Sequence, residues 1–267
     1  MNQFYVFLCS LASIGYFLLG LSFNVRIPFI SSHLGKHFLF ALSVICLGSA
    51  LLPEWFSDSG MQFGFSIAIA WMFWLASVLI WVEITITPES LSARYIFFPA
   101  VLGAVLPILL PSPVLEADLS FFFRFHILIA MLAYSSFALA VAQGSIMMAH
   151  EASLRKLKQK RITSGMPSLL EMDTSLVRIL FVSFTLISAT LASGIVINHE
   201  VGKNFIELDH KTIFAFAAWV IVLILLVGRM YFGWRGRFAA RLTIIGFIFL
   251  LFAYIGTQFV LEVLLDR

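Results

Sequence analysis

Eight long apolar runs constrain the fold of this chain more strongly than any other feature of its sequence. A helix needs about 20 apolar residues to cross the hydrocarbon core of a bilayer. The chain is 61% hydrophobic and only 12% charged, whereas a soluble domain carries about 25% charged residues. We therefore predict an all-α, polytopic membrane helix bundle of about eight transmembrane helices, forming a single integral membrane domain over residues 1–267. The runs lie at residues 4–23, 37–52, 61–84, 95–114, 125–148, 176–197, 212–232 and 239–265.

The distribution of Lys and Arg predicts how these helices are oriented. The odd-numbered connectors carry thirteen Lys and Arg residues, and the even-numbered connectors carry three. Because cytoplasmic loops collect basic residues, we expect the odd connectors in the cytoplasm and both termini outside. The first run has no basic segment before it and no clear cleavage site, so we interpret it as a retained span.

The remaining composition excludes several classes of protein. The net charge of +3 is explained by the basic cytoplasmic connectors, so no nucleic-acid partner is predicted.

The longest connector, residues 149–177, begins with a basic run that anchors topology or, alternatively, binds lipid headgroups. Cys9 and Cys46 lie inside apolar runs without metal-type spacing and are interpreted as core residues. The fourth run contains Pro99, Pro107 and Pro111 and is predicted to be kinked or broken.

A dense polar loop at residues 198–211 separates the sixth and seventh runs. It contains two histidines, three acidic residues and two lysines, and charge counting places it outside. Asp209, His210 and Lys211 come directly before the seventh run, where an aspartate predicts a helix N-cap. His199 and His210 stand eleven residues apart, wider than the usual spacing of zinc ligands. For each of them, the alternative to a ligand is a histidine of a solvated loop.

The predicted topology divides the six histidines by side. His33, His37 and His150 fall on the cytoplasmic side, whereas His126, His199 and His210 fall on the outer side. His126 opens the fifth run, and on a helix it shares a face with Ala130, Ala133, Tyr134 and Phe137.

An imidazole above an aromatic stripe offers the groups that a haem needs. His126 would supply an axial nitrogen, the apolar stripe would supply walls, and Arg124 would supply a charge for a propionate. The alternative is an interfacial histidine within an aromatic belt. From these residues alone, both interpretations stay open.

From Ser193 onward the order of features resembles the cytochrome c assembly protein family of membrane haem-handling proteins. In that family an outer loop, the WWD segment, ends in Asp-Pro-Lys and is followed by a helix with a tryptophan and a basic turn. His126 with Tyr134 resembles the family's outer-face haem histidine at the head of a helix. The resemblance defines a cytochrome c assembly-like region at residues 121–265. The matching stretches are residues 192–198, Asp209-His210-Lys211, Trp219, residues 233–241 and residues 253–256.

The resemblance implies a haem-binding, haem-handling protein without bond chemistry of its own. His126 would be an axial ligand of the haem iron, and His199 or His210 would be the second ligand. The partners implied are the lipid bilayer, apocytochrome c or another cytochrome c assembly membrane protein, in the bacterial cytoplasmic (inner) membrane. The remaining residues implied at the haem are Arg124 and Lys203 for the propionates, and Tyr134, Phe205, Asp209 and Lys211 for the pocket.

The chain also departs from the family pattern. Its loop contains no tryptophan, His210 replaces the proline of Asp-Pro-Lys, and no histidine follows the last run. These departures indicate a HemX-like or inner-membrane accessory branch rather than a full haem ligase. Two alternatives remain: a small-molecule permease or exporter, for which a broken fourth helix would argue, and a cofactor-free membrane regulator of haem synthesis.

Overall fold

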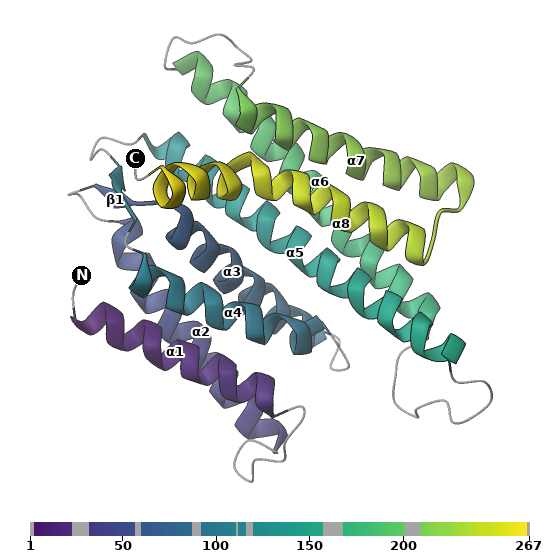
Figure 1. The fold of residues 1–267 in the computed structure, drawn as a ribbon, viewed down its shortest axis with the longest axis horizontal. Coiled ribbons are helices and arrows are strands. Elements are labelled where there is room, and N and C mark those ends of the chain that lie inside the picture. The colour runs from purple at the N-terminus through teal and green to yellow at the C-terminus, as the bar shows by residue number, and fades with distance from the viewer. Residues whose placement is uncertain are drawn as a thin grey trace. The chain divides into compact units, whose positions relative to one another are not determined.

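The computed structural model describes residues 3–22, 32–56, 60–86, 92–110, 112–115, 120–156, 168–200 and 209–265. These residues are almost entirely helical (Figure 1), which confirms the predicted all-α, polytopic fold. The α-helices are α1 (Gln3–Leu21), α2 (His33–Trp55), α3 (Phe65–Ile86), α4 (Ser92–Leu109), α5 (Phe121–Lys156), α6 (Leu169–Glu200), α7 (His210–Phe232) and α8 (Arg237–Leu251). Two π-helical segments, η1 (Phe252–Gly256) and η2 (Phe259–Leu264), follow α8.

Seven of the described helices are long and apolar enough to cross a membrane. The exception is α4, whose apolar part, Ile96–Leu109, is shorter than the others. A helix rises 1.5 Å per residue, so this part spans about 21 Å, less than a hydrocarbon core of about 30 Å. The assigned α4 is continuous through Pro99 and Pro107, so the broken fourth helix that would favour a permease is not seen. Pro111 lies outside the described residues.

The third and fourth helices are shorter than their apolar runs because the flanking residues form a small antiparallel strand pair. Strand β1 (Met61–Gln62) pairs with β2 (Val114–Leu115), and the backbone N–H of Phe63 donates to the carbonyl of Pro113 at 3.2 Å. Gly60, before β1, has φ of 111°, a conformation that favours glycine. Apolar content alone does not distinguish these strand residues from helix.

The chain divides into two compact units. Unit 1 comprises Met1–Phe121 together with Gln258–Arg267, and unit 2 comprises Phe122–Thr257. The boundary falls close to residue 121, where the assembly-like region was predicted to begin. The single domain over residues 1–267 stays a prediction.

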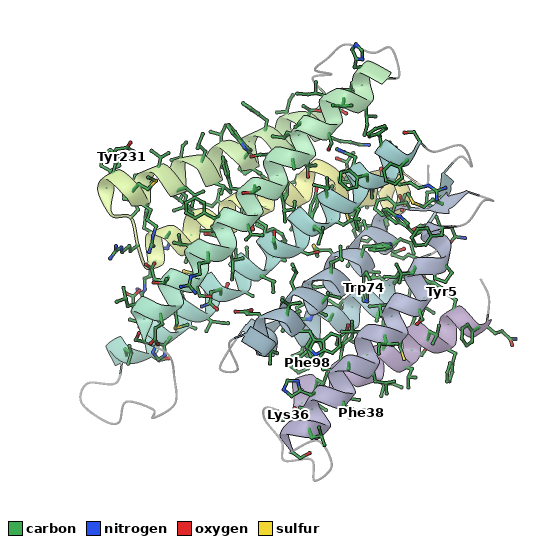
Figure 2. All side chains as sticks on the ribbon, turned by 180° about the vertical axis from the view of Figure 1, so that it is seen from behind. Tyr5, Lys36, Phe38, Trp74, Phe98 and Tyr231 are labelled. Atoms are coloured by element: carbon green, nitrogen blue, oxygen red, sulfur yellow. The ribbon has the colours of Figure 1, made fainter. Side chains whose placement is uncertain are left out.

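Unit 1 packs α1–α4 through close helix contacts. A Cβ at Gly15 would lie 2.1 Å from Ser43 Oγ, so α1 approaches α2 closely only because residue 15 is glycine, as is common between membrane helices. Trp74 Nε1 donates to the carbonyl of Val44 at 2.8 Å, which joins α3 to α2. Figure 2 shows Trp74 among these helices. Tyr16 is fully buried beside Phe97.

The C-terminal segment of unit 1 contacts the beginning of α3. The carboxylate of Glu262, in η2, accepts the backbone N–H of Phe65 at 2.9 Å, which satisfies one of the four unpaired N–H groups of a helix N-terminus. A Cβ at Gly64 would lie 2.5 Å from Glu262 Oε1. The rings of Phe65 and Phe259 add a contact at 5.0 Å.

Unit 2 is built around the antiparallel pair α5 and α6. Ser183 Oγ donates to Ser136 Oγ at 3.1 Å in its middle, and ten residues away on each helix His126 contacts Ser193. The pair therefore keeps one register over this length. Helix α7 packs on α6 and α8, and the core includes Phe137, fully buried.

Candidate functional site

His126 lies near the start of α5, where its imidazole contacts the last turns of α6. Its Nδ1 is 2.8 Å from Ser193 Oγ. Gly194 lies beside the ring, and a Cβ there would be in ordinary van der Waals contact, 3.5 Å from Cε1 of His126. The histidine is partly buried. The helix pair, rather than the loop, therefore positions the imidazole.

The hydrogen bonds of Ser193 indicate which ring nitrogen of His126 is free. Ser193 Oγ donates its one proton to the carbonyl of Thr190 at 3.0 Å, so it is best placed to accept from Nδ1–H of His126. This tautomer leaves a lone pair on Nε2, which has no hydrogen-bond partner among the described residues. Metal-binding histidines are commonly oriented in this way, by donating the other ring N–H to a fixed acceptor.

The face of α5 below His126 is turned into unit 2, as the helical spacing predicted. Ala133, Tyr134 and Phe137 are all buried. The hydroxyl of Tyr134 donates to the carbonyl of Leu250 at 2.6 Å, next to the point where α8 becomes π-helical. This bond fixes α5 against α8. Because the hydroxyl of Tyr134 is engaged in it, the ring is the part of this side chain that remains for contact with a ligand.

The start of α7 confirms the predicted N-cap. Asp209 accepts the backbone N–H of Thr212 at 2.8 Å, and His210 opens the helix. Lys211 Nζ lies 5.6 Å from the centre of the Tyr254 ring, a cation–π contact. Both His210 and Lys211 are exposed. The cap and the lysine therefore hold the end of the polar loop against unit 2.

The cap makes the stability of this helix end depend on pH. Burial alone would raise the pKa of Asp209, but hydrogen bonds from Thr212 and the charges of Lys211 and His210 hold this pKa below its ordinary value of 3.8. A lowered pKa in the folded state stabilises the protein above pH 3.8, and this contribution is lost as the pH falls through the folded-state value.

We expect Asp209→Ala to lower the free energy of unfolding by about 1 kcal/mol at pH 7. The loss should shrink as the pH falls below 3.8. Thermal unfolding at pH 7 and at a pH below 3.8 measures this loss of stability. Asp209→Asn is the control, because its amide caps the helix without titrating, so its advantage over Asp209→Ala should not change with pH. A stability difference between wild type and Asp209→Ala that stays constant as the pH falls below 3.8 would contradict the assignment.

A tryptophan contact holds α6 and α7 together below the loop. Trp219 Nε1 donates to Ser188 Oγ at 2.8 Å, and its ring stacks on Phe184 at 5.5 Å and on Phe216 at 5.7 Å. The two helices are thereby fixed on either side of the segment that joins them.

The structure places most of the predicted site residues at one end of unit 2. His199 is exposed in the last turn of α6, six residues and about 9 Å of helical rise beyond Ser193. Arg124 precedes His126 by two residues on α5 and is partly buried. Phe205 and Lys203 lie outside the described residues. Within the described ranges, no three His, Cys, Asp or Glu side chains are grouped to hold a metal ion.

Comparison with known proteins assigns the chain to a family. The sequence pattern of the Cytochrome C assembly protein family matches residues 30–265. The chain belongs to this family. The match includes most of unit 1 as well as the region at residues 121–265, and it indicates an assembly protein rather than a catalytic enzyme family.

Three relatives illustrate which proteins the chain is similar to. An "Uncharacterized 28.8 kDa protein" of Azospirillum brasilense is 28% identical over 58% of each chain. The "Inner membrane protein YpjD" of Escherichia coli K12 is 25% identical over 52% of each chain. A "Cytochrome c biogenesis protein CcsA" of Prochlorococcus marinus is 34% identical over 33% of this chain and 29% of the relative. The chain thus spans about half the length of the first two. No solved structure matches.

Sequence reasoning on this member of the Cytochrome C assembly protein family missed the partner of His126. Ser193 stood in the stretch that carries the resemblance, but sequence spacing assigns it no role. The available signal was a serine–glycine pair close to the C-terminal end of the sixth run, at residues 193–194. The HemX-like branch stays a prediction.

Proposed function

We propose that this chain binds haem at the outer end of unit 2 and presents it during the assembly of c-type cytochromes. The observation that carries the proposal is His126, whose Nδ1 is held by Ser193 at 2.8 Å while Nε2 keeps its lone pair for an iron. The family of the chain and its similarity to a cytochrome c biogenesis protein support the same role.

The residues around His126 fit the rest of a haem. His199 or His210, at the same end of unit 2, would be the second axial ligand. The cations Arg124 and Lys203 would neutralise propionates, and Lys211 would help to shape the pocket. Phe205, with Asp209 at the loop end, would complete the pocket and Tyr134 its floor. When bound, haem would supply the redox-active iron, and the chain would orient it.

The membrane setting supports an assembly role rather than an isolated one. The described helices are those of a multi-pass membrane protein, and a relative of similar length is named an inner membrane protein. We infer a location in the bacterial inner membrane. The partners would be apocytochrome c, or another membrane protein of cytochrome c assembly, at the outer face.

His126→Ala tests the proposal. Protein purified from haem-replete cells should show a haem absorbance band, and His126→Ala should lose most of it, because the iron loses its axial nitrogen. The matched control is His150→Ala, the same substitution at the opposite end of α5, which should keep the band. Single His199→Ala and His210→Ala variants should identify the second ligand by a change in the absorbance spectrum.

Two results would overturn this function. One is a haem-free wild-type protein from haem-replete cells combined with an unchanged set of c-type cytochromes after deletion of the gene. The other is equal haem content in His126→Ala and His150→Ala. Folding of the variants is checked independently by their elution volume and thermal unfolding in detergent, so loss of haem is distinguished from loss of structure.

A further inference from the structure

A second site lies at the opposite end of unit 2, where the ends of α5 and α6 meet the turn between α7 and α8. An open pocket of about 240 Å³ is present there. Its lining combines apolar side chains with charged groups, which is the composition of a site for an amphiphilic molecule. The lining includes Met147, Leu169, Leu170, Glu151, Asp173 and Arg235.

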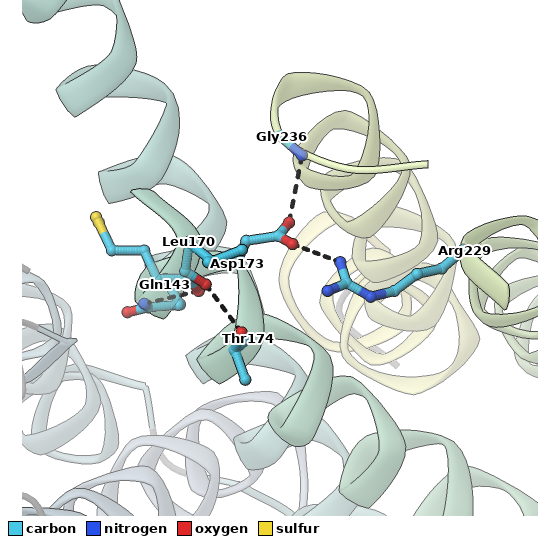
Figure 3. A network of polar contacts seen from close by, with 7 residues as sticks. Gln143, Leu170, Asp173, Thr174, Arg229 and Gly236 are labelled. Atoms are coloured by element: carbon cyan, nitrogen blue, oxygen red, sulfur yellow. Dashed lines mark hydrogen bonds and ion pairs between the residues drawn. The ribbon is translucent and has the colours of Figure 1, made fainter. Parts of the chain in front are cut away.

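Both carboxylates of the pocket are already engaged. Asp173 accepts Nη1 of Arg229 at 2.7 Å and the backbone N–H of Gly236 at 3.3 Å (Figure 3). Glu151 pairs with Nε of Arg237 at 3.3 Å. These pairs neutralise the negative charge that would otherwise repel an anion. Among the described residues that line the pocket, the charge left unpaired is the guanidinium of Arg235.

Arg235 is held in place by its backbone, and its guanidinium has no partner in the described part of the chain. The side chain is exposed and makes no hydrogen bond or ion pair with the described residues. The turn that carries it is shaped by Gly233 and Gly236, which adopt φ of 66° and 65°, a conformation that favours glycine. Trp234 packs so closely on Gly228 that a Cβ there would be 2.2 Å from the ring.

Exposed aromatic residues place this end at the boundary between the membrane and water. Tyr231, Phe232 and Phe238 are 77%, 73% and 48% exposed, and Figure 2 shows Tyr231 at the end of α7. Aromatic side chains of membrane proteins gather at the level of the lipid headgroups. The basic residues of the same turn predict the cytoplasmic side. A molecule in this pocket would therefore meet Arg235 at headgroup depth and apolar side chains beside it.

We propose that this pocket binds the headgroup of an anionic phospholipid of the cytoplasmic leaflet. Arg235 contacts the phosphate, for which a planar guanidinium is well suited. Met147, Leu169 and Leu170 contact the glycerol and the first carbons of the acyl chains. The bound lipid joins the ends of α5 and α6 to the α7–α8 turn. Basic pockets between membrane helices are known to hold anionic headgroups in this way.

The test measures binding of a fluorescent phosphatidylglycerol to the purified full chain in neutral detergent. Removing one cation near an anionic headgroup costs about fivefold in affinity, so Arg235→Gln should bind at least that much more weakly than wild type. Arg241→Gln is the matched control: Arg241 is exposed on α8 at the same end but does not line the pocket. Its affinity should stay within twofold of wild type.

A second variant and three competitors keep the proposal testable if Arg235→Gln does not fold. Leu170, 64% exposed, can be replaced by glutamate, which should weaken binding as Arg235→Gln does. Unlabelled phosphatidylglycerol should displace the probe, and phosphatidylcholine and glycerol phosphate should not. Equal losses in Arg235→Gln and Arg241→Gln would mean diffuse surface charge and overturn the proposal. Displacement by phosphatidylcholine as effective as by phosphatidylglycerol would overturn it as well, and displacement by glycerol phosphate would show a free-anion site instead.

Discussion

Replacing Asp173 with alanine is expected to lower the free energy of unfolding by about 3–5 kcal/mol. Asp173 is 4% exposed, and its carboxylate accepts from Arg229 at 2.7 Å and from the N–H of Gly236 at 3.3 Å. Its removal leaves a largely buried guanidinium without a counter-charge and a backbone donor without an acceptor. The end of α7 and the turn leading to α8 lose this anchor on α6.

Equilibrium unfolding in mild detergent, followed by tryptophan fluorescence, measures this loss. Glu151→Ala serves as the control, because its pair with Arg237 is more exposed and should contribute only up to about 1 kcal/mol. The double variant Asp173→Leu with Arg229→Met should recover much of the stability, since no unpaired charge remains. Equal, small effects of Asp173→Ala and Glu151→Ala would show that the buried pair is not formed.

Ser193→Ala is expected to weaken haem binding about 10–100-fold while His126 remains in place. The reason is positional: without the hydroxyl, Nδ1–H of His126 loses the acceptor at 2.8 Å that selects its tautomer and holds its ring. This prediction rests on the proposed haem function. Titration of haem into the haem-free protein, followed by absorbance, gives the affinity.

The control for this variant removes the same group elsewhere on α6. Ser183→Ala deletes a hydroxyl that bonds to Ser136 at 3.1 Å. Ser136 lies ten residues from His126 on α5, so this variant should leave haem affinity unchanged. Ser193→Thr should retain most of the affinity, because its hydroxyl can still accept. If Ser193→Ala binds haem as tightly as Ser183→Ala does, the imidazole is oriented by some other group.

Hydropathy predicted the helices well because lipid solvates the apolar side chains wherever they lie on a helix. The seventh run, residues 212–232, differs from α7 by two residues at its start. The same signal misplaced the ends of the third and fourth helices, because Met61 and Val114 are apolar yet form strands. It also underestimated the lengths of α5 and α6, because their polar ends extend beyond the hydrocarbon.

The candidate site was predictable in its residue types and not in its contacts. His126 and the Asp209 cap follow from local features, a histidine at the head of an apolar run and an aspartate before another. The partnership of His126 with Ser193 joins positions 67 residues apart. It depends on the register between α5 and α6, which apolar periodicity does not set, because either helix could slide by a turn and remain solvated by lipid.

By itself, the sequence determined the class of this protein: the abundance of apolar runs requires a bilayer, and the order of features from Ser193 onward resembles one family. Only the tertiary structure decided how polar groups are paired within that apolar setting. Asp173 pairs with Arg229, and Glu262 accepts the N–H of Phe65, 197 residues away in the sequence. Polar groups away from water are costly unless they are paired, so such pairs select one register among the many that hydrophobic residues would allow.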